Sequence, residues 1–438
     1  MDAILYWNDV ALEAVARDHT GSPAPLEQGG PTRTARALAI VHLAMYDAFN
    51  SITGSYTPYL PNLPMPTPGA SVNAALGAAA LTTLSQLYPS QYPRFLQAHQ
   101  AFLAGLTDGA VAITEGREQG QQVAEALLTL RQTDGSSNSV PYVSSPDPGR
   151  HRPDPLNPAQ GYLTPHWGQV KPFGITSAED FVADPFPPLD SARYAQDFND
   201  VKEKGALTGG TRTPEETTIG LFWAYDGAQK LGTPPRLYNQ IVRVIAEQQL
   251  NTLEQNARLF ALVNMAMADA GIQCWYSKYF YNIWRPVVGV READAYWGPS
   301  GVGDGNLETA GDPYWLPLGA PRTNQVGAKN FTPNFPAYPS GHATFGAASL
   351  DMVRLFYNND NIAFEFVSDE LNGESLDVEG YVRTKHSRSF ARLSDAIEEN
   401  GRSRVYLGVH WQSDAVAGIA SGQRIAEYLY TNYLLPTI

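Results

Sequence analysis

Apolar residues recur at intervals of three and four positions through most of the chain, which is the spacing of one face of an α-helix. This pattern predicts helices over residues 4–17, 32–51, 71–88, 91–106, 109–132, 191–204, 214–228, 238–248, 254–281, 343–357, 387–399 and 413–433. Alternating patterns typical of strands are few and short. The sequence therefore predicts an all-α fold of helical bundles packed side by side.

Proline, glycine and asparagine gather between these helices, at 52–69, 134–191 and 293–338. Segment 134–191 is the longest, and a loop of this length is expected to be functional or to wrap the surface. It contains His151 and His166, which could line the entrance to a site. We favour the simpler interpretation, in which both are surface-loop residues without a chemical role.

The composition, with 43% hydrophobic and 17% charged residues among 438, is that of a folded globular protein. A net charge of −14 argues against a nucleic-acid surface and against attraction to anionic lipid, so an anion site must concentrate its cations in one pocket. The single cysteine, Cys274, excludes an intrachain disulfide. Residues 1–9 lack a basic stretch, and no run of about 18 apolar residues occurs. We expect a soluble protein without signal peptide or membrane span, in a compartment that the sequence does not indicate.

Three stretches carry candidate chemistry. Ser340, Gly341 and His342 follow a proline-rich loop at the start of a predicted helix, which alone is more typical of a helix cap than of a site. Lys278 and Arg285 flank the end of the long helix, and the stretch 403–414 adds a further arginine and histidine. Together the three stretches supply two guanidinium groups, an ammonium group, two imidazoles, a hydroxyl and a glycine amide, which is a donor set for a tetrahedral oxyanion.

These stretches resemble the motifs of the vanadium haloperoxidases and of the type-2 phosphatidic acid phosphatase superfamily, which shares their site. Similarity to the fungal vanadium chloroperoxidases extends over residues 220–227, 232–236, 261–285, 335–346 and 403–418. The resemblance implies two packed four-helix bundles with a vanadate cofactor at one end of the second. We accordingly expect a single domain over 1–438, with an N-terminal half (1–190) and a C-terminal half (191–438) that carries the vanadate site.

The resemblance also implies roles for individual residues. Oxygen atoms of vanadate would be bound by Lys278, Arg285, Ser340, Gly341 and Arg404. His410 would be the axial ligand of vanadium, an ordinary role for imidazole, or the nucleophile in a phosphatase. His342 would act as acid and base at the opposite axial position, and Lys278 would polarise bound peroxide.

Four further residues are expected to support this chemistry. Asp226 resembles the carboxylate that pairs with the arginine matching Arg404. Asp414 follows His410 by four residues, so it either fixes the imidazole tautomer or only caps the last helix. Phe335 and Trp275 match positions that are Phe and Trp in fungal chloroperoxidases, where algal bromoperoxidases typically have His at the first. Both rings could also be ordinary core residues.

The resulting prediction is an all-α vanadium-dependent haloperoxidase that oxidises chloride or bromide with hydrogen peroxide and passes the product to a small organic acceptor. Neither nucleic acid nor a membrane is expected as a partner, and a homo-oligomer stays open. A soluble acid phosphatase would use the same residues, with His410 attacking phosphorus. A helical scaffold without catalysis would explain the helices but not the coincidence of these charged groups.

Overall fold

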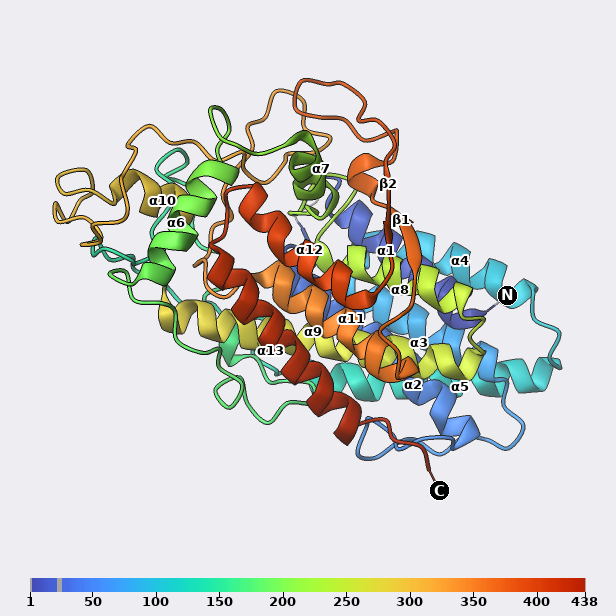
Figure 1. The fold of residues 1–438 in the computed structure, drawn as a ribbon. Coiled ribbons are helices and arrows are strands. Elements are labelled where there is room, and N and C mark those ends of the chain that lie inside the picture. Colours follow the sequence, from blue (N-terminus) through green and yellow to red (C-terminus); the bar gives the residue numbers. More distant parts are fainter. Residues whose placement is uncertain (1, 22–25, 438) are drawn as a thin grey trace.

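The computed structural model describes residues 2–21 and 26–437, and most of its regular structure is helical (Figure 1). The helices are α1 (Ala3–Asp18), α2 (Pro31–Thr53), α3 (Val72–Leu87), α4 (Tyr92–Ala104), α5 (Ala110–Arg131), α6 (Ala192–Lys204), α7 (Pro214–Phe222), α8 (Pro234–Gln248), α9 (Leu253–Tyr281), α10 (Pro286–Glu292), α11 (Gly341–Tyr357), α12 (Leu393–Tyr406) and α13 (Gln412–Asn432). Short 3₁₀ turns are η1 (Pro89–Gln91), η2 (Trp167–Gln169) and η3 (Asp369–Leu371). The prediction of an all-α fold is confirmed.

Helix α9 is the central element of the molecule. It is 29 residues long, and every residue from Asn256 to Trp275 is buried, as expected for a helix that is apolar around its whole circumference. Thr252 and Gln255 form a capping box at its start. Helix α2 packs on one side of α9, while α11 and α13 pack against another (Figure 1).

Two groups of helices therefore share α9. Helices α2, α3 and α5 pack together in the N-terminal part, and α11, α12 and α13 pack together in the C-terminal part. One hydrophobic core runs through both, with Leu38 of α2, Leu262 of α9 and Phe345 of α11 among its members. The division into halves at residue 190 stays a prediction.

Glycines allow α11 and α13 to approach closely. A Cβ atom at Gly422 would lie 2.4 Å from the carbonyl oxygen of Thr344, and one at Gly418 would lie 2.7 Å from that of Ser340. Only the hydrogen of glycine fits these positions. The close approach places the start of α13 beside the start of α11, where two of the predicted motifs lie.

The structure differs from the predicted helices in two places. Residues 387–390 form strand β2 (Ser387–Phe390), which pairs antiparallel with β1 (Phe364–Val367), so the helix predicted over 387–399 begins only at Leu393. Phe364 and Phe390 stack at 5.2 Å, and this cross-strand contact outweighs the local helical spacing. Helix α7 ends at Phe222 and not at residue 228.

Helix α9 ends at Tyr281, the last residue of its predicted range, and Asn282 follows in the left-handed conformation at φ 57°. Arg285 and Pro286 therefore lie beyond this helix. Arg285 is instead the N-cap of α10, and Pro286 occupies its first position, where proline is favoured. Arg285 thereby sits in an extended link between two helices.

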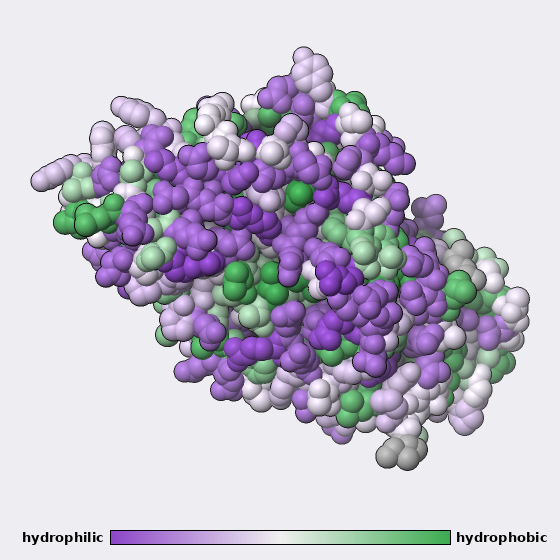
Figure 2. All heavy atoms as spheres, in the orientation of Figure 1, coloured by the Kyte–Doolittle hydropathy of each residue, from purple (hydrophilic) through white to green (hydrophobic). Residues whose placement is uncertain are grey.

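The outer face shown in Figure 2 is predominantly hydrophilic, with scattered apolar residues. Within the described residues, none of the helices combines the length and the apolar character that crossing a membrane would require.

Candidate functional site

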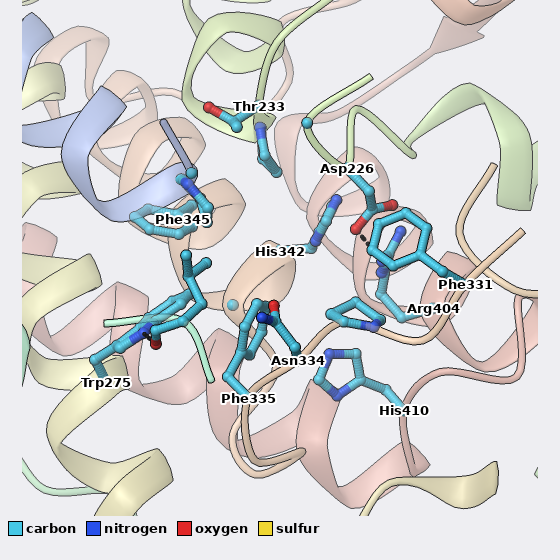
Figure 3. A pocket seen from close by; sticks show the side chains of 17 residues that line it. Asp226, Thr233, Trp275, Phe331, Asn334, Phe335, His342, Phe345, Arg404 and His410 are labelled. Atoms are coloured by element: carbon cyan, nitrogen blue, oxygen red, sulfur yellow. Dashed lines mark hydrogen bonds and ion pairs between the residues drawn. The ribbon is translucent and has the colours of Figure 1, made fainter. Parts of the chain in front are cut away.

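A cavity of about 100 Å³ lies beside the first turn of α11 and brings together residues that are distant in the sequence (Figure 3). Asp226, Gly341, His342, Arg404 and His410 form its polar part. The remaining lining is mostly apolar and consists of Gly30, Pro31, Leu163, Gly227, Thr233, Pro234, Trp275, Phe331, Pro333, Asn334, Phe335 and Phe345. Three predicted site residues, Lys278, Arg285 and Ser340, are buried next to this cavity but do not line it.

The start of α11 contributes Gly341 and His342 to the cavity lining. Ser340 is the N-cap, and its Oγ accepts a hydrogen bond from the amide of Ala343 at 3.4 Å. The amide of Ser340 donates to the carbonyl of Asp414 at 2.8 Å, which ties this turn to α13. Gly341 lies in the first helical turn, where amides lack intrahelical acceptors, so the helix end suits an anion.

Arg404, in the last turn of α12, forms the ion pair that the resemblance implied. Its Nη2 donates to Asp226 Oδ1 at 2.7 Å. Asp226 is carried by the turn after α7, and its second carboxylate oxygen is buried without a protein partner among the described residues. The same holds for Nε and Nη1 of Arg404, so this guanidinium keeps two nitrogens free for a ligand.

Arg285 fixes which nitrogen of His410 carries the proton. Nη1 of Arg285 donates to His410 Nε2 at 2.9 Å and to the carbonyl of Val409 at 2.7 Å. Because a guanidinium group can only donate, Nε2 must be the unprotonated nitrogen. The proton of His410 is therefore on Nδ1. The Nε2 lone pair, which metal coordination would use, accepts the hydrogen bond from Arg285, so a metal at Nε2 would have to replace this bond.

Asp414 performs both of the tasks that the sequence left open. Its Oδ2 accepts a hydrogen bond from His410 Nδ1 at 2.7 Å and another from the amide of Trp411 at 3.0 Å. The first bond holds the imidazole tautomer, and the second caps α13. Burial raises the pKa of Asp414 to about 8, while Lys278 opposes this shift.

His342 is held by a backbone carbonyl. Its Nε2 donates to the oxygen of Ala224 at 2.5 Å, and a carbonyl can only accept, so Nδ1 is the unprotonated nitrogen. No group among the described residues hydrogen-bonds to Nδ1. Burial, and then the charge of Arg404, lower the pKa of His342 to about 3, so the ring is neutral near pH 7.

Lys278 differs from the expectation of direct contact with an anion. Its Nζ donates to the carbonyls of Pro336 and Ala337, each at 2.9 Å, and to that of Pro339. All three N–H groups of the ammonium are thus used by the loop that leads into α11. Direct contact with an anion in the cavity would require Lys278 to leave one of these carbonyls. Burial lowers the pKa of Lys278 to about 7, while the nearby Asp414 opposes this shift.

The two predicted aromatic residues lie against each other beside these cations. The ring centroids of Trp275 and Phe335 are 4.7 Å apart. The Phe335 ring also lies 5.1 Å from Lys278 Nζ and 4.8 Å from the guanidinium carbon of Arg285. Both aromatic residues line the cavity, and they also pack in the hydrophobic core, Trp275 as a member and Phe335 against it.

The site fits a tetrahedral oxyanion such as vanadate. Nη2 of Arg285 and two nitrogens of Arg404 are buried donors without a partner among the described residues. Leaving such groups unsatisfied is costly, whereas an anion would accept their hydrogen bonds. Burial, together with the charge of the nearby Arg404, lowers the pKa of Arg285 to about 9, so an anion would also relieve repulsion between cations. His410 supplies the nitrogen ligand that a metal centre in this oxyanion would take.

Sequence reasoning missed several lining residues. Leu163 and Pro31 come from the N-terminal part of the chain, which contains none of the three motifs. Phe331 and Phe345 lie just before and just after the motif at 335–342, and no sequence pattern distinguished them from core residues. The interpretation of His151 as a surface residue is wrong, because this side chain is 1% exposed. His166 is also buried, at 4%.

Comparisons with known proteins agree over most of the chain. The family model described as "Vanadium chloroperoxidase N-terminal domain" matches residues 1–186, and the one described as "VCPO second helical-bundle domain" matches residues 258–435. The vanadium chloroperoxidase of Curvularia inaequalis is 36% identical, in an alignment that covers 94% of this chain and 79% of that protein.

Solved structures support the fold independently. A bacterial vanadium-dependent iodoperoxidase superimposes with a TM-score of 0.77 at 23% identity, covering 98% of this chain and 96% of that one. A holo-type bacterial vanadium-dependent chloroperoxidase superimposes with a TM-score of 0.71 at 14% identity, covering 97% and 96%. At 23% and 14% identity, these two structures support the fold alone, whereas the fungal protein is also similar in sequence. By that similarity, the chain belongs to the vanadium chloroperoxidase family.

Proposed function

We propose that this protein is a vanadate-dependent haloperoxidase that converts hydrogen peroxide, a halide and a proton into water and a hypohalous acid. The observation that carries this proposal is the set of buried guanidinium nitrogens of Arg285 and Arg404 that have no partner within residues 2–21 and 26–437, next to the unprotonated Nε2 of His410. Bound vanadate supplies a Lewis-acidic vanadium(V) centre at which peroxide becomes reactive toward halide. The protein's task is to hold that group, to move protons and to control water.

The anion would be held by charged and backbone donors acting together. Arg404 and Arg285 present guanidinium N–H groups whose charge is insensitive to pH near neutrality. Gly341 adds a backbone amide at the start of α11, and the hydroxyl of Ser340 can turn to donate. Asp226 keeps Arg404 in place through their 2.7 Å ion pair. His410 would be the metal ligand, held by Asp414 in the tautomer that leaves Nε2 free of hydrogen.

His342 is placed to accept a proton from hydrogen peroxide. Its Nδ1 is unprotonated, and the residue lines the cavity. A neutral imidazole can accept a proton at Nδ1 and later return it to the departing oxygen, which is ordinary general acid–base behaviour. Lys278 would act through the loop 336–339, which it holds with three hydrogen bonds.

Chloride and bromide are both proposed as substrates. Trp275 and Phe335 line the cavity with apolar rings and offer little hydrogen bonding to water. Such a lining favours the removal of water from chloride, which is small and strongly hydrated. It also strengthens the attraction between the buried cations and an incoming anion, because Coulomb interactions increase as the local dielectric falls. The apolar lining would accept a small organic acceptor for the halogenation that follows.

Halogenation of an activated diketone by vanadate-loaded protein, followed separately with chloride and with bromide at mildly acidic pH, tests this proposal. We expect peroxide-dependent turnover with both halides. Turnover with bromide alone would contradict the proposed role of the aromatic pair, while turnover with neither halide would contradict the proposed function.

A further inference from the structure

His342 is connected to a buried carboxylate through one peptide group. The Ala224–Tyr225 peptide accepts a hydrogen bond at its carbonyl oxygen from His342 Nε2, at 2.5 Å. The N–H group of the same peptide, on Tyr225, donates to Glu370 Oε1 at 3.0 Å. The imidazole, the peptide group and the carboxylate thus form one continuous chain of hydrogen bonds.

Glu370 is fully buried and itself well held. It lies in η3, between β1 and β2, and none of its surface is exposed. Its Oε2 accepts hydrogen bonds from Arg383 Nη1 at 2.6 Å and from the hydroxyl of Thr323. Arg383 supplies a positive charge for the buried carboxylate, and Thr323 donates a second hydrogen bond to the same carboxylate oxygen. The other oxygen, Oε1, accepts the hydrogen bond from the Tyr225 amide.

The same segment fixes the turn that contains this peptide. Tyr225 has a positive φ of 45°, which is unfavourable for a residue with a side chain and must be maintained by its surroundings. The Tyr225 hydroxyl accepts a hydrogen bond from the amide of Asp369 at 2.9 Å and donates to Gln240 at 2.9 Å. The hydroxyl of Ser368 donates to the carbonyl of Phe222 at 2.7 Å.

We propose that Glu370 is a positioning residue for His342. By holding the amide of Tyr225, Glu370 aims the carbonyl of Ala224 at His342 Nε2. This carbonyl keeps the proton on Nε2 and leaves Nδ1 unprotonated. A carboxylate at the N–H end of a peptide also makes its carbonyl a stronger acceptor, since hydrogen bonds in a chain polarise one another. The arrangement follows the logic of a carboxylate that orients a catalytic histidine, with a peptide group between the two.

This inference rests on the role of His342 in the proposed function, but the tautomer can be measured without turnover. In metal-free protein labelled with ¹⁵N in the histidine rings, long-range ¹H–¹⁵N spectra report which ring nitrogen is protonated. The His342 signals are assigned by their loss in His342→Ala. In the parent we expect one tautomer, with the proton on Nε2, and this measurement requires no substitution at Glu370.

Two variants test the connection. Glu370→Gln removes the charge, and Glu370→Gln combined with Arg383→Gln removes the buried ion pair as a unit, so that folding does not depend on an uncompensated arginine. The matched control is Glu399→Gln. Like Glu370, Glu399 forms an ion pair with an arginine, Arg388. It also contacts the turn after α7, but there its Oε1 accepts a hydrogen bond from the indole nitrogen of Trp223 at 3.0 Å and not from the Tyr225 amide.

In both Glu370 variants we expect a mixture of His342 tautomers and a decrease in kcat/KM for peroxide of roughly 10–100-fold, the usual effect of removing an orienting partner. Vanadate affinity should change much less than kcat/KM. Glu399→Gln should leave the tautomer unchanged. An unchanged tautomer in both Glu370 variants, or an equal change in Glu399→Gln, would overturn the inference. If the tautomer responds as expected but the loaded parent oxidises no halide, the positioning role stands and the proposed function falls.

Discussion

At the scale of single residues, the site depends on which donors remain free. Arg285, Arg404 and Lys278 are all buried cations, yet only the two arginines keep nitrogens without a partner among the described residues. Lys278 has given its three N–H groups to backbone carbonyls. The arginines are therefore the residues whose hydrogen bonds an anion would gain directly, and Lys278 contributes through charge and through the loop it holds.

Arg404→Lys should consequently weaken vanadate binding although it preserves the charge. Lysine carries all its donors on one nitrogen, so it lacks the planar fork with which arginine can bind an anion through two nitrogens while the third pairs with Asp226. Loss of one hydrogen bond to a charged group costs about 1.5–3 kcal/mol, so we expect affinity to fall by roughly ten- to hundredfold. Equilibrium titration of the metal-free variant measures this. Arg402→Lys is the control, because Arg402 lies on the same helix and pairs with Asp200 at 2.8 Å, away from the cavity. Equal affinity in parent and Arg404→Lys would place Arg404 outside the anion site.

Anion binding should also weaken as pH rises above about 7. Burial lowers the pKa of Lys278 to about 7, and a bound anion favours the ammonium form, which raises that pKa. Below this pH Lys278 is already charged, whereas above it binding must take up a proton, so affinity falls. Asp414, whose pKa is raised to about 8, acts in the same direction, because an anion favours its neutral form.

Sulfate is the suitable probe, because its charge does not change over this range. Calorimetric titration should give constant affinity below pH 7 and decreasing affinity above it, approaching about tenfold per pH unit while one proton is taken up. Lys278→Met should bind sulfate more weakly and with a shallower dependence on pH. Sulfate affinity in the parent that does not fall with rising pH would contradict the predicted linkage.

Most residues of the site were identified from sequence, but their contacts were not. The motifs marked Arg285, His342, Arg404 and His410 because their side chains suit an oxyanion and its metal. The three carbonyl partners of Lys278 lie 58 to 61 positions further along the chain, so local spacing could not indicate them. Glu370 was not recognised either, since its partner is a backbone amide 145 positions away.

At the scale of elements, the site is assembled where α11 and α13 begin. The amide of Ser340 on one helix is bonded to the carbonyl of Asp414 on the other. Close packing of the two helices is therefore a condition for His410 and Gly341 to face the same cavity.

Gly422→Ala should test this packing. The added Cβ would lie 2.4 Å from the carbonyl of Thr344, so one helix must shift. Overpacking of this kind costs about 1–3 kcal/mol, which exceeds the gain of roughly 0.5–1 kcal/mol expected for alanine in a helix. We expect a lower urea midpoint for Gly422→Ala. Gly105→Ala, at the end of α4, is the control, because its nearest neighbour would be 3.5 Å away. A midpoint for Gly422→Ala equal to that of the control would contradict the packing argument.

Long helices were predictable and short elements were not. Helices such as α2, α9 and α13 repeat their apolar spacing over many turns, which makes the pattern unambiguous. Strand β2 and helix α10 have four and seven residues, and β2 exists because a partner strand pairs with it. The turn after α7 resembled a continuing helix, but contacts with residues 368–370 impose its left-handed residue.

At the scale of the whole molecule, a protein with a net charge of −14 maintains a buried cluster of cations. Without a ligand these cations repel one another, and Arg285 and Arg404 keep buried N–H groups that find no acceptor in the described part of the chain. Both costs oppose folding. A ligand that binds only the folded state offsets them and stabilises the protein.

Vanadate should therefore raise the melting temperature of the metal-free protein. At a concentration of 100 times Kd it adds about 2.7 kcal/mol, and with an unfolding entropy of about 2.1 cal/mol/K per residue over 438 residues the expected increase is about 3 °C. Differential scanning calorimetry at matched ionic strength measures it, with nitrate as the control for a planar anion. An unchanged melting temperature at saturating vanadate would argue against a buried site.

Reconstitution with vanadate tests the central claim most directly. The measurement is the initial rate of bromination by metal-free protein as vanadate is added at fixed peroxide and bromide. We predict no turnover before addition and a rate that saturates at one vanadate per chain, with His410→Ala requiring much more vanadate to reach its maximum. Bromination by the metal-free protein that vanadate does not change, or vanadate bound at one per chain without any turnover, would contradict the account.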